Sequence, residues 1–345
     1  MNMRTKFSAE EKQTFNLALD LARCNYAQQI EGTKLTKADL EDKLRKTIKE
    51  DMLGGLTVFQ AMRRNKNTVF EIVEEIVNTV IGEDVFTSPF VEEFVEVKNR
   101  GLGDTTAFYS EGGLLSVATF AGNHWDTNRQ SIDLGAEVTL PKEWCYIHVY
   151  EDLERFLLGI TPLDKLVDKI YKSIDKFFKD RIYLTFQNIS NAVPSAFAVT
   201  GNTEAALGDL VDKVQAAGGY NDITIAGTKS ALRKLAGVVP DKMFANSQKE
   251  AKASTGSIGE WEGNKLMVIP QVLIPGTYNT ALDNSKVYIL GGDTKPVKFE
   301  YYGDARTMEN LDGKANADQS IDLQVQTKFG LGLVLSPYFG VFTFQ

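Results

Sequence analysis

The most constraining feature of the sequence is a long helical run over residues 161–187. Apolar residues recur there at three- and four-residue spacing, which predicts an amphipathic α-helix with one buried face. Thr161 suits the N-cap, and Pro162 suits the first turn. No Gly or Pro follows before residue 187, so the helix would extend about 38 Å. The stripe is formed by Leu163, Leu166, Val167, Ile170, Ile174, Phe177, Phe178 and Leu184.

Composition indicates a globular chain. The 345 residues are 43% apolar and 24% charged, which permits two domains or one elongated domain. Cys24 and Cys145 are the only cysteines, so a disulfide framework is excluded and a reducing cytoplasm is the expected compartment. The start of the chain has no apolar signal region, and no apolar stretch approaches 18 residues. We therefore expect neither secretion nor a membrane partner.

The net charge of −8 is unevenly distributed. Residues 1–66 hold 13 Lys and Arg against 9 Asp and Glu, whereas the remainder holds 25 against 37. An acidic body argues against a dedicated nucleic-acid-binding protein, which would present a basic face. It suits a surface that lies near nucleic acid without adhering to it.

The N-terminal region is predicted to be helical. Apolar periodicity predicts helices over 8–30 and 36–48, followed by a break at Gly54 and Gly55. Each helix has too little apolar surface for a core of its own, so the segment is either a small helical subdomain or an arm that reaches a neighbouring subunit. A third helix is predicted over 67–80, and its acidic residues Glu71, Glu74 and Glu75 indicate a solvated face.

Over residues 90–142 the residue pattern changes to one typical of strands and turns, with little apolar content. Ile132, Leu134, Ala136, Val138 and Leu140 alternate with other residues at period two, which is typical of a half-buried strand. Such a region cannot form its own core. We interpret it as a projecting hairpin that packs on another chain; the alternative is an irregular β-region of one domain.

The remainder of the chain has an α/β pattern and an all-β end. A strand is predicted over 144–150, a short helix over 151–159 and a loop over 189–202. Further helices are predicted over 203–217, 228–237 and 242–253, and further strands over 223–226, 266–270, 286–290, 297–302, 320–335 and 339–344.

No motif indicates catalysis, a cofactor or a metal. His124 and His148 have no second His or Cys at ligand spacing. There is no GxSxG elbow and no GxGxxG before a helix. Thr228 separates Gly227 from Lys229, so the phosphate-loop pattern is not met and a turn with a helix N-cap is the better interpretation. We therefore assign no catalytic, cofactor-binding or metal residues.

The order of the segments resembles the major capsid proteins of tailed bacteriophages, which have the Hong Kong 97-type fold also found in encapsulins. The resemblance covers about residues 60–345. Its most specific parts are QAMRRNKNTVFEIVEEI at 60–76, the helix from Pro162, GEWEGNKLMVIPQVLIPG at 259–276 and the closing KFGLGLVLSPYFGVF.

The resemblance implies an α+β, Hong Kong 97-like capsid fold with an N-terminal arm, an extended β-hairpin loop, a spine helix, and peripheral and axial domains. The implied boundaries are an N-terminal helical extension at 1–55, the arm at 56–90, the extended loop at 91–143, the peripheral domain with its spine helix at 144–187 and 293–336, and the axial domain at 188–292 and 337–345.

The implied function is that of a non-enzymatic coat protein which assembles in the host cytoplasm as hexamers and pentamers of an icosahedral virion shell. Expected partners are other copies of the chain, scaffold, portal and other head proteins, and packaged double-stranded DNA enclosed without sequence-specific binding. The alternatives are an encapsulin that encloses an enzyme cargo and a soluble α/β enzyme.

Some members of the family join a loop lysine to a peripheral-domain asparagine. Here Lys98 and Lys142 lie only at the ends of the loop, and its middle has no lysine. We therefore expect no such cross-link in this protein.

Overall fold

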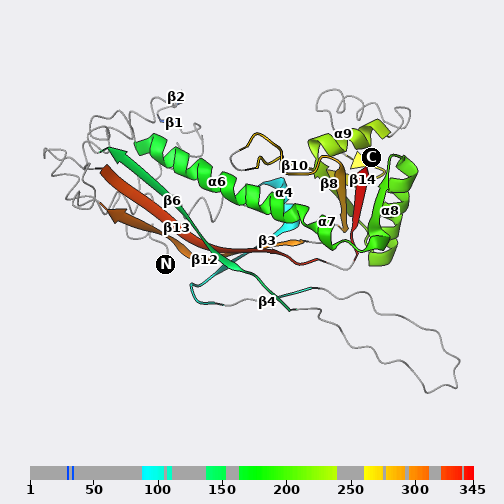
Figure 1. Cartoon of the computed structure of the whole chain (residues 1–345), viewed down its shortest axis with the longest axis horizontal. Coiled ribbons are helices and arrows are strands. Elements are labelled where there is room, and N and C mark those ends of the chain that lie inside the picture. Colours follow the sequence, from blue (N-terminus) through cyan, green and yellow to red (C-terminus); the bar gives the residue numbers. More distant parts are fainter. Residues whose placement is uncertain are drawn as a thin grey trace, which may run out of the picture.

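The computed structural model describes residues 29–30, 33–34, 88–104, 107–110, 137–152, 163–238, 260–274, 277–291, 295–310, 320–335 and 338–345. Together they form an elongated body (Figure 1). A four-stranded sheet runs beneath one long helix, and a six-stranded sheet lies beyond the C-terminal end of that helix. The helix is α6, Leu163–Gln187, and it confirms the long helix predicted from the apolar stripe.

The four-stranded sheet brings together distant parts of the chain. Its order is β3 (Val95–Arg100), β12 (Val297–Asn310), β13 (Ser320–Leu333) and β6 (Lys142–Asp152). β12 is parallel to β3 and antiparallel to β13, which is antiparallel to β6. The edges of the sheet are thus β3, which lies within the predicted extended loop, and β6, which begins at its end, and two strands from near the end of the chain separate them.

One face of this sheet is covered by α6 (Figure 1). Ile170, Ile174, Phe178, Ile182 and Phe186 are four residues apart and buried, as an amphipathic helix requires. The Phe178 ring contacts those of Phe299 and Phe329 at centroid distances of 5.4 and 5.3 Å. Burial of each large side chain stabilises the fold by roughly 1.5–3 kcal/mol, so the helix and the sheet depend on one another.

The six-stranded sheet has a mixed topology. Its order is β7 (Ala198–Gly201), β14 (Gly340–Phe344), β11 (Lys286–Gly291), β8 (Ile223–Thr228), β10 (Asn264–Ile269) and β9 (Glu260–Trp261). Helices α8 (Glu204–Gly218) and α9 (Lys229–Val238) share an apolar cluster with it. Every residue of β8 is buried, which explains its unbroken run of small and apolar residues.

A short helix, α4 (Pro89–Phe94), joins the two sheets. The Ser88 hydroxyl accepts a hydrogen bond from the Val91 amide, and Pro89 occupies the first turn. The Phe90 ring contacts Tyr183 and Phe186 of α6, and Phe186 in turn contacts Tyr288 of β11. One continuous apolar cluster therefore contains residues from both sheets.

Most of the predicted elements in the described ranges are confirmed, including the helix over 203–217 and the three closing strands. Gly219, at a φ of 65°, ends α8. The Thr228 hydroxyl accepts a hydrogen bond from the Ala231 amide, so it caps α9 as predicted. The predicted helices over 36–48, 67–80 and 242–253, and most of that over 8–30, lie outside the described residues.

Four local predictions were wrong. Gln29–Ile30, placed at the end of a helix, is β1 and pairs with β2, Thr33–Lys34. Residues 90–94 belong to α4, because they have a capped start and three buried apolar residues. Residues 151 and 152 continue β6 instead of starting a helix, since their backbones pair with β13. The expected loop over 189–202 contains α7 (Ile189–Ala192), a 3₁₀ turn (Ser195–Phe197) and β7, which gains its order by pairing with β14.

Candidate functional site at the root of the extended hairpin

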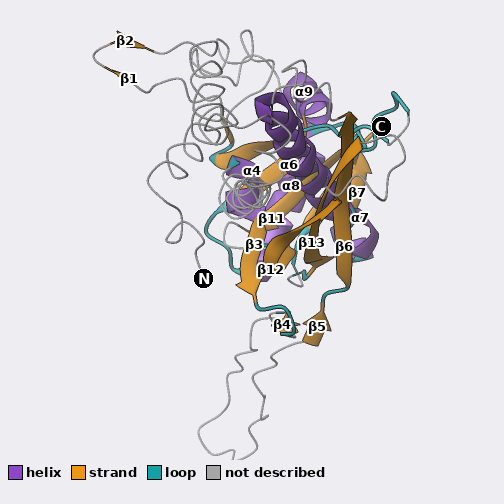
Figure 2. Cartoon of the chain, turned by 90° about the vertical axis from the view of Figure 1, so that its left-hand side faces the viewer, coloured by secondary structure: helices purple, strands orange, loops and turns teal. Residues whose placement is uncertain are grey.

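The described ends of the predicted extended loop form the stem of a hairpin. Strands β4 (Ala107–Tyr109) and β5 (Glu137–Thr139) pair antiparallel, with Phe108 opposite Val138. The stem leaves the four-stranded sheet on the side away from α6 (Figures 1 and 2). We call residues 101–104, 107–110 and 137–142 the hairpin root, and the side of the four-stranded sheet opposite α6 the open face.

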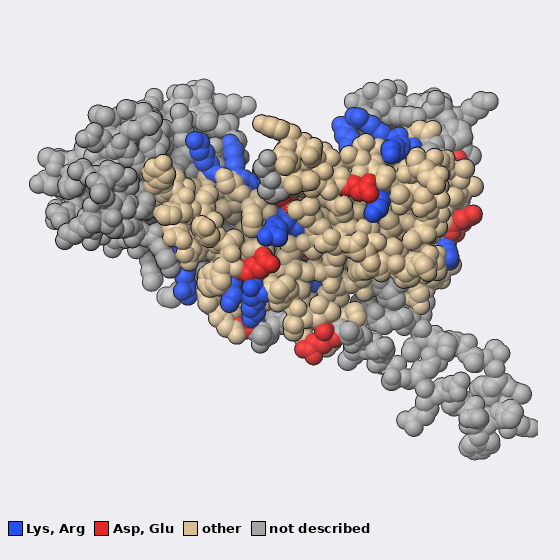
Figure 3. Space-filling model, in the orientation of Figure 1, with Lys and Arg blue, Asp and Glu red and all other residues tan. Residues whose placement is uncertain are grey.

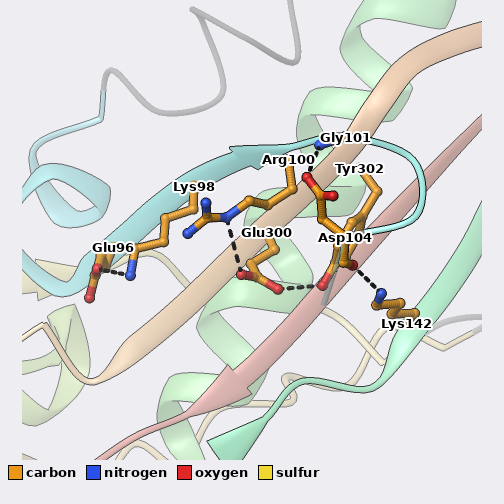
Figure 4. Close-up of polar contacts among 8 residues, drawn as sticks. All are labelled: Glu96, Lys98, Arg100, Gly101, Asp104, Lys142, Glu300 and Tyr302. Carbon is orange, nitrogen blue, oxygen red and sulfur yellow. Dashed lines mark hydrogen bonds and ion pairs between the residues drawn. The ribbon is translucent and has the colours of Figure 1, made fainter. Parts of the chain in front are cut away.

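Polar contacts fix the turn at which the chain enters the hairpin (Figure 4). The Asp104 carboxylate accepts a hydrogen bond of 3.1 Å from the Gly101 amide. The Lys142 ammonium donates to the Asp104 carbonyl and lies 4.5 Å from the centre of the Tyr302 ring. Asp104 lies just before β4 and Lys142 just after β5, so this hydrogen bond links the two ends of the hairpin stem.

Apolar side chains of the root pack onto glycines in the open face. A Cβ atom added to Gly332 would lie 2.6 Å from a terminal carbon of Leu140, and one added to Gly330 would lie 3.3 Å from the Leu140 Cβ. Leu140 therefore occupies the space that side chains at these glycines would fill. Gly303, at a φ of 70°, makes similar room for Leu102.

A small apolar cluster completes the root. Phe108, Leu140 and Val334 are buried against one another. The Phe108 ring also lies 4.3 Å from the Lys98 ammonium and 5.8 Å from that of Lys298. Cations over an aromatic face are favourable contacts. The stem is thus attached to β3 and β12 as well as to its own turn.

A buried carboxylate lies beneath this root. The Glu300 side chain is fully buried on β12, accepts a hydrogen bond from the Tyr302 hydroxyl and has Arg100 Nε at 4.0 Å (Figure 4). Burial raises the pKa of the Tyr302 phenol, and the contact with Glu300 raises it further. The phenol is therefore a fixed hydrogen-bond donor that helps to compensate the burial of the carboxylate.

A second charged group lies next to it on the same face. Glu96 forms ion pairs with Lys98 and Lys298. Burial alone would raise the pKa of Glu96, but the hydrogen bonds from the two ammonium groups outweigh burial and hold the pKa below its usual range. Lys98 and Lys142, the two lysines at the ends of the loop, are both engaged at the root; the expected absence of a covalent cross-link stays a prediction.

This geometry fixes the hairpin stem to the four-stranded sheet. A family model described as SPbeta prophage-derived putative capsid protein YonB matches residues 15–343. The chain belongs to this capsid protein family. No curated protein matches the sequence.

Solved capsid structures resemble the chain at low sequence identity. The satellite phage P4 procapsid that includes the size determination protein has a TM-score of 0.49 at 11% identity, over 77% of this chain and 90% of that one. The mature capsid of bacteriophage PhiM1 has a TM-score of 0.47 at 11% identity, over 73% and 86%. The capsid of the empty GTA particle has a TM-score of 0.47 at 11% identity, over 74% and 89%.

Membership of the YonB family identifies the chain as a phage major capsid protein, a component of the virion that assembles into a shell of many subunits. The described architecture confirms the predicted α+β, Hong Kong 97-like fold: a spine helix, a hairpin rooted on one sheet, and a second sheet with its own helices. Neither the encapsulin nor the soluble enzyme is supported by the family match.

The residues considered for chemistry at the sequence level are dispersed in this YonB-family chain. His148 is exposed on β6, whereas His124 and Cys24 lie outside the described residues. Burial raises the pKa of the Cys145 thiol to about 12, so it is not a reactive thiolate. Within the described ranges, no group of His, Cys, Asp or Glu side chains could hold a metal ion. None of the described helices has both the length and the apolar character to cross a membrane.

Sequence reasoning did not identify the hairpin root. Glu300 stands in the apolar run VKFEYY, where a lone carboxylate is a signal for a buried charge. Gly330 and Gly332 stand two apart in KFGLGLVL, which places both on one face of a strand. The missing information was which strands would lie beside them.

Proposed function

We propose that hexamers and pentamers of this chain form the shell, with each extended hairpin lying on a neighbouring subunit. The observation that carries this proposal is the hairpin root. Contacts at both limbs fix the stem to the sheet on the side away from α6. Fixing the direction of a contact segment in advance lowers the entropy cost of association.

We also propose roles for the parts of the chain. Two packing arrangements support this division. Helix α6 packs on one face of the four-stranded sheet, and α8 and α9 pack on the six-stranded sheet. The assigned parts are the helical extension at 1–55, the arm at 56–90, the extended loop at 91–143, the peripheral domain at 144–187 and 293–336, and the axial domain at 188–292 and 337–345. The basic N-terminal extension would dock on the inner side of the shell or across a neighbour.

The face that carries α6 and α9 is proposed to line the DNA-filled interior. Figure 3 shows Lys and Arg side chains gathered over both helices. On α9 these are Lys229, Arg233 and Lys234, all exposed, and the helix has no acidic residue. Such a patch attracts phosphates without reading bases. DNA would then be enclosed through non-specific contacts, although the chain as a whole is acidic.

Further partners of a phage head follow from the same proposal. They are a scaffold, a portal and other head proteins, with assembly in the host cytoplasm and no enzymatic activity of the subunit itself. Electron microscopy of the purified chain tests the central proposal. Hexamers, pentamers or closed shells are expected, and a stable 38 kDa monomer at high concentration would contradict it.

A further inference from the structure

The connection between β10 and β11 forms a small projection of its own. We call its described residues, 271–274 and 277–282, the finger. In the view of Figure 1 the finger extends from the six-stranded sheet toward α6. Its two limbs are hydrogen-bonded to each other, because the Ile274 amide donates to the Asn279 carbonyl at 2.9 Å. The finger therefore has a defined shape.

The base of the finger is fixed to the body of the subunit. The Gln271 side chain donates a hydrogen bond of 3.1 Å to the Leu282 carbonyl and accepts one of 3.0 Å from the Leu282 amide. Val272 and Leu282 are buried in the apolar cluster that also contains Phe90 of α4. A segment held in this way loses little further entropy when it binds a partner.

The tip of the finger is apolar and exposed. Leu273, Ile274 and Tyr278 are 45, 44 and 98% exposed. Leu273 pairs with Thr280 on the returning limb, so the three side chains lie near one turn. Together they expose roughly 350 Å² of surface, which is the size of apolar patch that commonly marks a protein contact.

The composition of the finger indicates the class of its partner. Residues 266–282 contain no Asp, Glu, Lys or Arg, although 24% of the whole chain is charged. A segment without cations cannot neutralise phosphates, so DNA does not fit it. The chain belongs to a family of capsid proteins, whose subunits contact many copies of themselves. A second copy of the chain is therefore the partner that this apolar tip fits.

The finger starts on the β3 side of the subunit. Strand β10, where it begins, contacts α4, and Lys265 of β10 forms an ion pair with Glu93 of α4. Helix α4 leads directly into β3, which is one edge of the four-stranded sheet, and β6 is the other edge. Figure 2 shows α4 and β3 on one side of the subunit and β6 on the other.

An exposed aromatic side chain of α6 lies toward the β6 side. Phe177 is 37% exposed, and its ring contacts that of Phe329 on β13, next to β6. The Arg181 guanidinium lies 5.7 Å from the centre of the Phe177 ring and 3.7 Å from the Glu143 carboxylate of β6. A ring beside a half-exposed guanidinium can receive a tyrosine through apolar burial and a cation–π contact.

We propose that the tip of the finger in one subunit, formed by Leu273, Ile274 and Tyr278, contacts Phe177 and Arg181 of a second copy. Two different surfaces meet in this contact, so repeating it around an axis closes a ring of subunits. The inference rests on the proposed shell function. It specifies a contact between the bodies of adjacent subunits that does not involve the extended hairpin.

Assembly of a double variant tests the proposal. Ile274→Ser and Tyr278→Ser together should raise the protein concentration needed for assembly by at least about tenfold, because a few apolar anchors dominate interface energies. Both side chains are exposed, so the far-UV circular dichroism and the unfolding midpoint of the subunit should change little. The matched control is Tyr278→Phe, which keeps the ring and should assemble as the unmodified chain does.

A second pair of variants tests the receiving surface. Arg181→Gln removes the guanidinium beside Phe177 and should also raise the concentration needed for assembly. Lys176→Gln removes an exposed cation from the same helix and should leave that concentration unchanged. Equal effects of the two variants would show that the general charge of α6, and not this contact, governs assembly.

Photo-cross-linking identifies the surface that the finger contacts. Benzoylphenylalanine placed at Tyr278, in a mixture of isotopically heavy and light chains, should cross-link to α6 of the other chain near Phe177 and Arg181. Cross-links within one chain, to another segment or to DNA would overturn the proposed contact. If the double variant and the unmodified chain assemble at the same concentration, the finger contact is wrong while the shell function stands. If the unmodified chain never assembles, both fail.

Discussion

Glu300 is a buried charge beneath the hairpin root. Its carboxylate is fully buried, with the Tyr302 hydroxyl and Arg100 as partners. Replacing Glu300 with Ala should lower the free energy of unfolding by about 2 kcal/mol, because the buried Tyr302 hydroxyl loses its acceptor and Arg100 loses its ion-pair partner. Glu300→Gln keeps the shape and one acceptor and should cost about half as much. Urea denaturation measures both.

The control for this measurement is an exposed ion pair. Glu143 lies 3.7 Å from Arg181, and the two side chains are 52 and 50% exposed. Glu143→Ala should change the free energy of unfolding by no more than about 0.5 kcal/mol. Equal losses for Glu300→Ala and Glu143→Ala would show that the buried cluster contributes no more than a solvated pair.

Glu96 gives the open face a dependence on pH. Because its folded pKa is lowered, its ionised form stabilises the fold above the unfolded pKa, and this stabilisation is lost as the pH falls through the folded pKa. Glu96→Gln should cost up to about 1 kcal/mol at pH 7, since solvent screens a partly exposed group, and less at pH 3, where part of this stabilisation is lost.

Urea titrations at the two pH values make this comparison. Glu137→Gln, which changes an exposed carboxylate on β5, is the control and should show no such pH dependence. A loss for Glu96→Gln that is equal at pH 7 and pH 3 would show that packing, not charge, accounts for its effect.

At the scale of elements, periodicity predicted what each segment forms but not what it pairs with. The stripe of α6 is visible in the sequence because it repeats over many residues, and the core of β6 was predicted as a strand over 144–150. The short elements α4 and β7 were missed, because a six-residue helix and a four-residue strand depend on tertiary contacts for their order. The insertion of β12 and β13 between β3 and β6 is a non-local arrangement that no local pattern contains.

The hairpin should be separable from the body at its stem. Replacing residues 111–136 with a short Gly-Ser linker keeps Phe108, Leu140 and the turn at Asp104, so the hairpin root retains its contacts. We expect an unchanged unfolding midpoint by calorimetry and a loss of assembly in sedimentation. A larger deletion that also removes Phe108 should lower the midpoint. Loss of the fold in the shorter deletion would mean that the segment is internal structure.

At the scale of the whole molecule, the two sheets form one mechanical unit. The cluster that contains Phe186 of α6 also contains Tyr288 of the six-stranded sheet and Phe299 of the four-stranded sheet. A continuous core of this kind transmits a rotation of one sheet to the other. The hairpin on the open face and the cations over α6 and α9 are therefore held on defined sides of the subunit (Figures 1 and 3).

The proposed interior face leads to a prediction about DNA. Changing Lys229, Arg233 and Lys234 of α9 to Gln should weaken the binding of unassembled subunits, in which this face is accessible, to non-specific duplex DNA. The dependence of log K on log salt should become shallower by roughly 0.9 for each phosphate that the protein no longer neutralises. Fluorescence anisotropy over a range of salt concentrations measures both quantities. Arg306→Gln, which removes an exposed cation from the open face, should leave the slope unchanged. If Arg306→Gln lowers the slope and the α9 variant does not, the open face, and not the α9 face, lies toward the DNA.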